Sequence, residues 1–310
     1  MDNKEILTIS IPTYNRENFL KSSLDRLLLQ VTDEVKIVVR DNASTNYDFW
    51  KFSENYKDSG VEFYRNDVNI GGDANIARAF ETCTTKWLWV LGDDDVIEDD
   101  AILNVLKILH EKEDSIYVKF NWNSNKDVVG LVEFANLMTP RWSFGTSFFI
   151  SECIHNIATT SDDMHFHYRY LSTSCGQILR VMRHLIDHPR SLCSFVQCGI
   201  IKNQCCDSPS WSYVDYAYNQ IAIFDIFKSQ RSILKGNIFK DIITMCYTYI
   251  SDSDLPLRTK IEYLNIFAYK HGLVNMVRYN SYDIFRSVAV VLLGNKNYRM
   301  FMSLIRSIKN

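Results

Sequence analysis

The chain has 310 residues, of which 46% are hydrophobic and 23% charged, a composition typical of a globular protein with a sizeable core. Its formal net charge of -3 argues against a nucleic-acid-binding protein, which usually carries a basic domain. The charge is uneven. Residues 255–310 contain nine Lys and Arg against two Asp and Glu, a net of +7, so residues 1–254 carry -10.

No apolar run reaches the roughly 18 residues that indicate a transmembrane helix, and the charged segment Met1–Glu5 does not resemble a signal peptide. We therefore expect a cytoplasmic protein whose eight cysteines are mostly reduced thiols. The cysteines lack the C-x-x-C pairs of a zinc site, and His184 and His188 lack the Glu of an H-E-x-x-H motif. These residues predict no structural metal.

Short apolar runs alternate with helical stretches over the first 120 residues. The run Ile6–Ile11 predicts a buried strand that ends at Pro12, because proline cannot donate a hydrogen bond to a sheet. A helix follows, with leucines on one face at Leu20, Leu24, Leu27 and Leu28. Further strands are predicted at 35–39, 61–64, 87–91 and 116–120, and further helices at 73–83 and 102–109.

Polar residues follow three of these strands. Pro12–Arg16 follows the first, Asp41-Asn42 the second and Asp93–Asp95 the fourth. Alternating strands and helices predict a parallel sheet with helices on both faces, and ligands of such sheets bind beyond the carboxyl ends of the strands. The sequence therefore predicts a ligand site at that edge.

The alternating pattern weakens after Asn121. A strand is predicted at Phe144–Ile150 and a helix at Gln177–Leu185, and the chain is expected to be helical beyond Trp211. In the last helix, one face carries Phe301, Leu304, Ile305 and Ile308, and the other Arg299, Ser303, Arg306 and Asn310. We expect an α/β domain over residues 1–210 and a helical C-terminal region over 211–310.

Three consecutive aspartates, Asp93-Asp94-Asp95, follow the apolar strand at 87–91. Like charges crowded at the end of a buried strand cost free energy unless a cation compensates them. Asp93 and Asp95 have the chemistry of ligands for Mn²⁺ or Mg²⁺, whose coordination the phosphates of a nucleotide complete. The alternative is a solvated turn, which is how we interpret Asp99-Asp100 at the start of the next helix.

Four short motifs occur in a fixed order: Ile9-Ser10-Ile11-Pro12-Thr13-Tyr14-Asn15-Arg16, Asp41-Asn42-Ala43-Ser44, Gly71-Gly72-x-x-Asn75-x-x-x-Ala79 and Gly92-Asp93-Asp94-Asp95. Their order and spacing resemble those of family-two glycosyltransferases of the bacterial surface-polysaccharide type, and four motifs in register are far more specific than one. The resemblance is good over Leu7–Phe120, faint over Phe144–Leu185 and almost absent over the last hundred residues.

The resemblance implies a GT-A fold and an inverting, metal-dependent transferase. Its donor would be a nucleoside diphosphate sugar, typically a UDP-sugar, and its acceptor a saccharide or a lipid-linked saccharide. The implied metal is Mn²⁺ or Mg²⁺ at Asp95 and Asp93. The implied nucleotide-sugar site comprises Pro12, Thr13, Tyr14, Arg16, Asp41, Gly71, Gly72, Asn75, Arg78, Asp93 and Asp94.

Within that site, Tyr14 would contact the base, and Asp41 would accept a hydrogen bond from it. The alternative for Asp41-Asn42 is an ordinary Asx turn. Gly71-Gly72 would let the backbone approach the donor, or would only shape a turn before an N-cap at Asp73.

An inverting transfer also needs a general base for the acceptor hydroxyl. The family usually places an aspartate before a helix for this purpose, but the corresponding segment, Ser172–Gln177, holds no carboxylate. The nearest candidates are Asp162, Asp163, His165 and His167, of which we favour Asp163. The alternative is that Asp162-Asp163 only forms a polar loop or a helix cap.

The basic C-terminal region favours peripheral contact with the inner membrane surface, since basic amphipathic helices bind anionic headgroups. Packing on the catalytic domain is an equal alternative. Two other function classes compete with a glycosyltransferase. A sugar nucleotidyltransferase would need a Gly-rich loop after the first strand, where this chain has Pro12–Arg16. A non-catalytic sugar-nucleotide or carbohydrate-binding module would explain the missing base.

Overall fold

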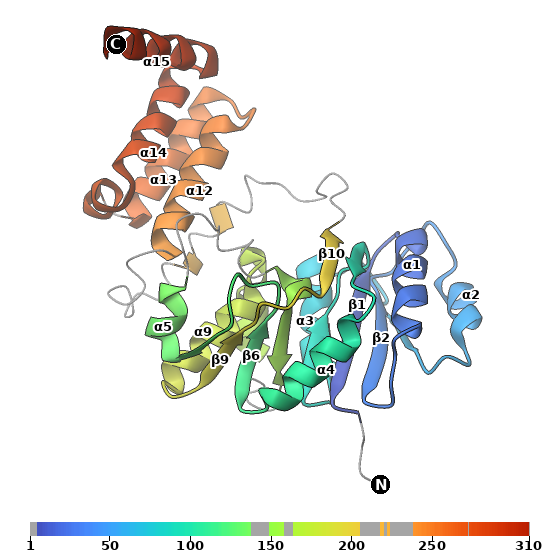
Figure 1. Ribbon diagram of the computed structural model, residues 1–310. Helices are drawn as coiled ribbons and strands as arrows, with labels where there is room; N and C mark the ends of the chain where they lie inside the picture. Colours follow the sequence, from blue (N-terminus) through green and yellow to red (C-terminus); the bar gives the residue numbers. More distant parts are fainter. Residues whose placement is uncertain are drawn as a thin grey trace. The chain divides into compact units, whose positions relative to one another are not determined.

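The computed structural model describes residues 5–137, 149–157, 164–204, 218–219, 222–223, 238–271 and 273–309. These residues form two compact units (Figure 1). The described residues within Met1–Phe134 and Phe148–Ser208 form the first unit, and those within Ala135–Ser147 and Pro209–Asn310 form the second.

The first unit begins with three strands and their connecting helices: β1 (Leu7–Thr13), α1 (Glu17–Leu28), β2 (Val35–Asp41), α2 (Phe49–Ser53), the 3-10 helix η1 (Glu54–Tyr56) and β3 (Glu62–Arg65). It continues through α3 (Gly72–Thr82), β4 (Trp87–Val90), β5 (Asp95–Ile97), α4 (Ala101–Glu111), β6 (Ser115–Lys119), β7 (Lys126–Val129) and the start of α5 (Gly130–Asn136), whose last two residues are assigned to the second unit. After the gap come η2 (Ile150–Glu152), β8 (Cys153–Asn156), α8 (Met164–Arg169), η4 (Leu171–Thr173), α9 (Gly176–Asp187), β9 (Leu192–Phe195) and β10 (Ile201–Gln204).

Eight strands form one sheet in the order β3-β2-β1-β4-β8-β6-β9-β7. Strands β3, β2, β1 and β4 are parallel neighbours, as are β6 and β9. Strand β8 runs antiparallel between β4 and β6, and β7 is antiparallel to β9. The predicted α/β fold with a mostly parallel sheet is therefore confirmed.

Side-chain alternation along β1 explains why helices cover both faces of this sheet. Leu7, Ile9 and Ile11 pack against the leucines of α1 and the apolar face of α4 in one core. On the other face, Leu88 and Val90 of β4 pack against Phe80 of α3. Figure 1 shows α1 and α4 on one side of the sheet and α3 on the other. The predicted strands at 6–11, 35–39, 61–64, 87–91 and 116–120 correspond to β1, β2, β3, β4 and β6.

The second half of the first unit differs more from prediction. Residues 138–148 lie outside the described part, and with them most of the strand expected at Phe144–Ile150; Ile150 itself begins η2. The strand of this region is β8, whose His155 and Asn156 are buried although both are polar. The helix predicted at Gln177–Leu185 is confirmed as α9.

The second unit contains α12 (Ile238–Asp252), α13 (Leu257–His271), α14 (Leu273–Leu293) and α15 (Asn295–Lys309). The first three pack on one another and α15 packs on α14 (Figure 1). A small core forms where Tyr298 of α15 meets Ala289 and Val290 of α14. The predicted helical C-terminal region is therefore present. None of the helices in the described part of the chain is long and apolar enough to cross a membrane.

Candidate active site

Three polar segments meet at the carboxyl edge of the parallel strands. Thr13 at the end of β1 is paired in register with Asp41 at the end of β2. The neighbouring strand β4 continues into Leu91, whose amide bonds the carbonyl of Ser10 at 2.9 Å. The turn with Asp93–Asp95 follows directly, so the structure brings the three predicted clusters together at one rim.

Asp93 is held by groups from the β1 segment. Thr13 Oγ1 donates a hydrogen bond to Asp93 Oδ2 at 2.6 Å. The Arg16 guanidinium contacts Asp93 Oδ1 at 3.1 Å and Asp94 Oδ2 at 2.7 Å. Burial raises the pKa of Asp93, while Thr13 and Arg16 oppose that rise. Arg16 therefore compensates two of the three consecutive carboxylates.

Asp95 has a different environment. Its carboxylate accepts a hydrogen bond of 2.5 Å from Ser151 Oγ, which itself accepts one of 2.9 Å from the Gly92 amide. Among the described residues no Lys, Arg or His forms an ion pair with Asp95, and burial raises its pKa to about 7. A Cβ at Gly92 would lie 2.5 Å from Asp95 Oδ2, so a larger residue there would displace the Asp95 carboxylate.

Ser151 was not found from the sequence, since it belongs to no motif and lies 56 residues after Asp95. Its backbone is anchored because Trp89 Nε1 donates to the Ser151 carbonyl at 2.8 Å. The adjoining Glu152 forms a buried ion pair with Lys119, whose Nζ also donates to the Phe120 carbonyl at 2.8 Å. The sequence did not indicate that pair either.

The rim offers a divalent cation a buried carboxylate, that of Asp95. Within the described ranges no group of three or more His, Cys, Asp or Glu side chains is arranged as a metal site. Mg²⁺, however, is commonly held by one or two carboxylates together with substrate phosphates. Asp95 is the buried carboxylate of the cluster without a cationic partner, whereas Asp93 is already paired with Arg16. A cation at Asp95 would supply the missing compensation.

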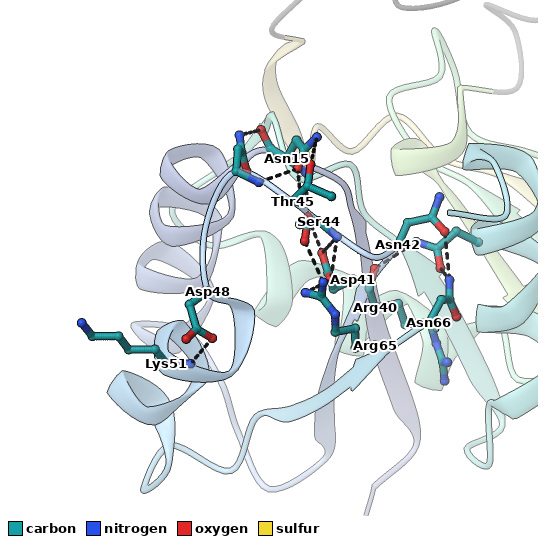
Figure 2. A network of polar contacts seen from close by, with 12 residues as sticks. Asn15, Arg40, Asp41, Asn42, Ser44, Thr45, Asp48, Lys51, Arg65 and Asn66 are labelled. Atoms are coloured by element: carbon teal, nitrogen blue, oxygen red, sulfur yellow. Dashed lines mark hydrogen bonds and ion pairs between the residues drawn. The ribbon is translucent and has the colours of Figure 1, made fainter. Parts of the chain in front are cut away.

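Asp41 is completely buried. Its carboxylate accepts hydrogen bonds from the amide and hydroxyl of Ser44 and an ion-pair contact of 2.7 Å from Arg65 Nη1 (Figure 2). Arg65 Nη2 donates to the Ser44 carbonyl at 2.7 Å, which closes the loop. A nucleoside base would reach the Asp41 carboxylate only if Ser44 or Arg65 moved.

A chain of asparagine side chains connects the end of β2 to the start of α3. Asn42 Oδ1 accepts from Asn66 Nδ2 and from the Ile70 amide, each at 3.0 Å (Figure 2). Asn75 is buried, and it donates to the Arg40 carbonyl at 2.9 Å while accepting from Asn66 at 2.9 Å. Asn75 was predicted to reach the donor, and its carboxamide is engaged in holding α3 against β2.

The other predicted donor residues lie near the surface. Gly71 has φ of 87°, and both Gly71 and Gly72 are exposed with open space where a Cβ would stand. Tyr14 is 39% exposed. Arg78 is exposed and pairs with Glu81 at 2.9 Å. Pro12 pairs with Arg40 within the sheet. The glycine backbone and the Tyr14 ring are thus open to a ligand.

The four candidate bases have different outcomes. Asp162 and Asp163 lie outside the described residues. His165 is exposed on α8. His167 is 1% exposed, its ring lies edge-on to Phe80 at 5.1 Å, and burial together with Arg180 lowers its pKa to about 3. His167 therefore occupies the position of a neutral core residue.

The sheet with its acidic turn after the fourth strand has the architecture of a GT-A fold. Residues 8–170, more than half of the chain, match glycosyl transferase family 2, and the chain belongs to this family. A 120-residue segment is 28% identical to the abequosyltransferase RfbV of Salmonella typhimurium, covering 36% of this chain and 35% of that protein. The match thus spans about a third of the relative's length.

Solved structures resemble the fold. S. aureus TarS, residues 1–349, superposes with a TM-score of 0.51 at 15% identity, covering 93% of this chain and 79% of that chain. The same protein in complex with UDP-GlcNAc gives a TM-score of 0.52 at 14% identity, covering 93% and 81%. At this identity the likeness concerns the fold.

Proposed function

We propose that this chain is an inverting glycosyltransferase that moves a sugar from a nucleoside diphosphate, UDP before others, to a saccharide or lipid-linked acceptor in surface-polysaccharide synthesis. The observation that carries the proposal is the rim where Thr13 and Arg16 both bond Asp93, beside Asp95, which has no cationic partner among the described residues. The names of two similar proteins support the class: one is an abequosyltransferase, and the other was solved with UDP-GlcNAc.

The residues at the rim have complementary tasks in this proposal. Mn²⁺ or Mg²⁺ at Asp95, with Asp93 nearby, would neutralise the negative charge that develops on the departing diphosphate. Arg16 holds Asp93 and Asp94 in place and brings a guanidinium to the edge where phosphates would bind. The exposed backbone of Gly71-Gly72 admits the donor closely, and the Tyr14 ring offers a face to the base.

Thermal unfolding in the presence of nucleotide sugars tests this proposal. A ligand that binds only the folded protein stabilises it by mass action, by about 2.7 kcal/mol at a concentration of 100 Kd. We expect one nucleotide sugar in a panel of different bases and sugars to raise Tm with Mn²⁺ and to lose most of that effect with chelator. No shift with any member of the panel would contradict the proposal. Binding without transfer to any acceptor would favour the binding-module alternative.

We further propose that residues 1–210 hold the catalytic domain and that residues 211–310 contact the acceptor or the cytoplasmic face of the membrane. Several apolar side chains of α14 and α15 are exposed, namely Phe285, Leu292, Met300 and Phe301, and Lys296 and Arg299 are exposed beside them on α15. This combination favours anionic lipid surfaces. Cosedimentation with vesicles containing anionic lipid, but not with neutral vesicles, is the expected result. If the same amount of protein stayed in the supernatant with anionic vesicles as with neutral vesicles, membrane contact would be rejected.

A further inference from the structure

A carboxylate outside the Asp93–Asp95 cluster contacts the start of a distant helix. Asp73 lies in the first turn of α3, and Ser174 lies two residues before α9. Ser174 Oγ donates a hydrogen bond to Asp73 Oδ2 at 3.0 Å. The two residues are 101 positions apart, so the fold, and not local sequence, brings them together.

The topology places both residues at the same edge as the candidate active site. Helix α3 starts after the end of β3 and leads back to the start of β4, which is parallel to the strands before it. Helix α9 leads to the start of β9 in the same way. Strand β9 is parallel to β6, and β6 and β4 are both antiparallel to β8, so β9 has the direction of β4. Both helices therefore begin at the carboxyl edge of the sheet, where Asp93 and Asp95 lie.

Asp73 differs from Asp41, Asp93 and Asp94 in its charge environment. Asp41 is paired with Arg65, and Asp93 and Asp94 with Arg16. Asp73 is only partly buried, and within the described part of the chain it forms no ion pair; its hydrogen-bond partner is the neutral hydroxyl of Ser174. Within the described residues, the Asp73 carboxylate is therefore not neutralised by a basic side chain, and only its Oδ2 atom is engaged by Ser174.

Two opposing influences set the protonation of Asp73. Burial raises its pKa, and the Ser174 hydrogen bond lowers it. The N-terminal end of α3 also favours the ionised form. The titratable groups on α3 and on the helices packed against it have other environments. On α3, Arg78 pairs with Glu81. On α8, Tyr168 donates to Glu81 at 3.0 Å, His167 packs on Phe80, Arg169 stacks on Tyr170, and His165 is exposed. On α9, Arg180 stacks on Phe80, Arg183 pairs with Asp187, and His184 contacts Ser191.

We propose that Asp73 is the general base of the transfer and that Ser174 is its positioning residue, an inference that rests on the proposed function. As the acceptor oxygen forms its bond to the anomeric carbon, its proton passes to the Asp73 carboxylate. The bond between that carbon and the diphosphate oxygen breaks, and its electron pair leaves with the diphosphate. Asp73 then returns the proton to water. Ser174 orients the carboxylate and keeps it ionised.

The test compares Asp73→Asn with Asp67→Asn, an exposed aspartate in the loop that precedes α3. Two quantities are measured: the Kd of the nucleoside diphosphate by calorimetry and the turnover number with donor and acceptor. We expect Asp73→Asn to lower turnover by about 100-fold or more, the usual contribution of a general base, with Kd unchanged within about twofold. Asp67→Asn should leave both unchanged.

Ser174→Ala supplies a readout that a purely structural role would not move. Since the Ser174 hydrogen bond lowers the pKa of Asp73, its loss should shift the acidic limb of the pH–kcat profile to higher pH. A variant with lower turnover at every pH and an unmoved limb would overturn the role of Ser174.

The inference as a whole is overturned if Asp73→Asn keeps turnover within about threefold of wild type, or if its loss is matched by an equal loss of nucleotide binding. Asp163→Asn is measured in parallel, and a larger loss there would assign the base to Asp163. If the proposed function itself is wrong, the result is different, because wild type would then release no nucleoside diphosphate from any donor.

Discussion

Ser151 Oγ donates a hydrogen bond of 2.5 Å to Asp95 while it accepts one from the backbone amide of Gly92. One hydroxyl thus contacts both the backbone of the acidic turn and the carboxylate of Asp95. The residue that follows, Glu152, is tied to Lys119, so the turn is supported from the antiparallel part of the sheet.

Ser151→Ala should weaken Mn²⁺-dependent binding of nucleoside diphosphate by about 10-fold or more, because partners of a metal-binding carboxylate commonly contribute this much. Calorimetry with and without Mn²⁺ measures the effect. Ser124→Ala, at an exposed serine, is the control. An unchanged Kd would show that Ser151 does not orient Asp95.

Substitutions of the aspartates in the turn should reduce sugar transfer to different extents. Asp95→Ala should abolish transfer, and Asp93→Ala should weaken it severely, since Asp95 has no cationic partner in the part of the chain that the structure describes. The loss should appear in Mn²⁺-dependent donor binding. Near-normal turnover of Asp95→Ala in chelator-treated buffer would contradict the metal assignment.

Asp41 should matter for stability as well as binding. Asp41→Ala leaves the Arg65 guanidinium without its buried partner, and breaking such a pair costs about 3 kcal/mol of unfolding free energy. We also expect weaker binding of nucleoside diphosphate alone. Tyr14→Ala, at a half-exposed residue, should weaken binding with little change in unfolding free energy. Denaturant unfolding measures the loss of stability. If the folded Asp41→Ala variant still binds nucleoside diphosphate with the wild-type Kd, Asp41 has a structural role only.

Two buried histidines predict a dependence of stability on pH. Burial lowers the pKa of His155 and His167 to about 3, so the folded state stays unprotonated while the unfolded state binds protons below about pH 6.5. The stability that the two neutral histidines allow is therefore fully present above about pH 6.5, and it decreases as the pH falls toward 3. Between pH 7 and pH 5, proton binding to each histidine in the unfolded state should lower the free energy of unfolding by about 2 kcal/mol.

Denaturant unfolding of His167→Leu at the two pH values checks this. The variant should lose about 2 kcal/mol less than wild type between pH 7 and pH 5, whatever its packing costs at pH 7. His165→Leu, on the exposed side of the same helix, should behave as wild type. Identical pH dependence in all three proteins would mean that His167 is protonated in the folded state.

The sequence predicted the parts of the fold that follow local periodicity. Strand β1 could be recognised because Leu7, Ile9 and Ile11 are apolar, although it continues through Pro12 to Thr13 and does not end at Pro12 as predicted. Strand β8 could not, because its His155 and Asn156 are polar residues that only tertiary packing buries. The strand expected shortly before it could not be compared over 144–148, which lie outside the described residues.

The candidate site shows the same division. Asp93, Asp95 and Asp41 were found from their positions after strands, and the structure gathers those strand ends at one edge. Ser151, which bonds Asp95, and Arg65, which pairs with Asp41, were not found, since they lie 56 and 24 residues away in the chain and belong to none of the four motifs. Long-range hydrogen bonds leave no periodic trace in sequence.

Acceptor-dependent release of nucleoside diphosphate from a nucleotide sugar with Mn²⁺, measured for wild type and for Asp95→Ala, shows whether this rim is the site of a metal-dependent sugar transfer. We predict release by wild type that increases with acceptor, and none above background by the variant at any acceptor concentration. Equal release by the two proteins would contradict the account, as would a wild type that releases no nucleoside diphosphate from any donor and acceptor.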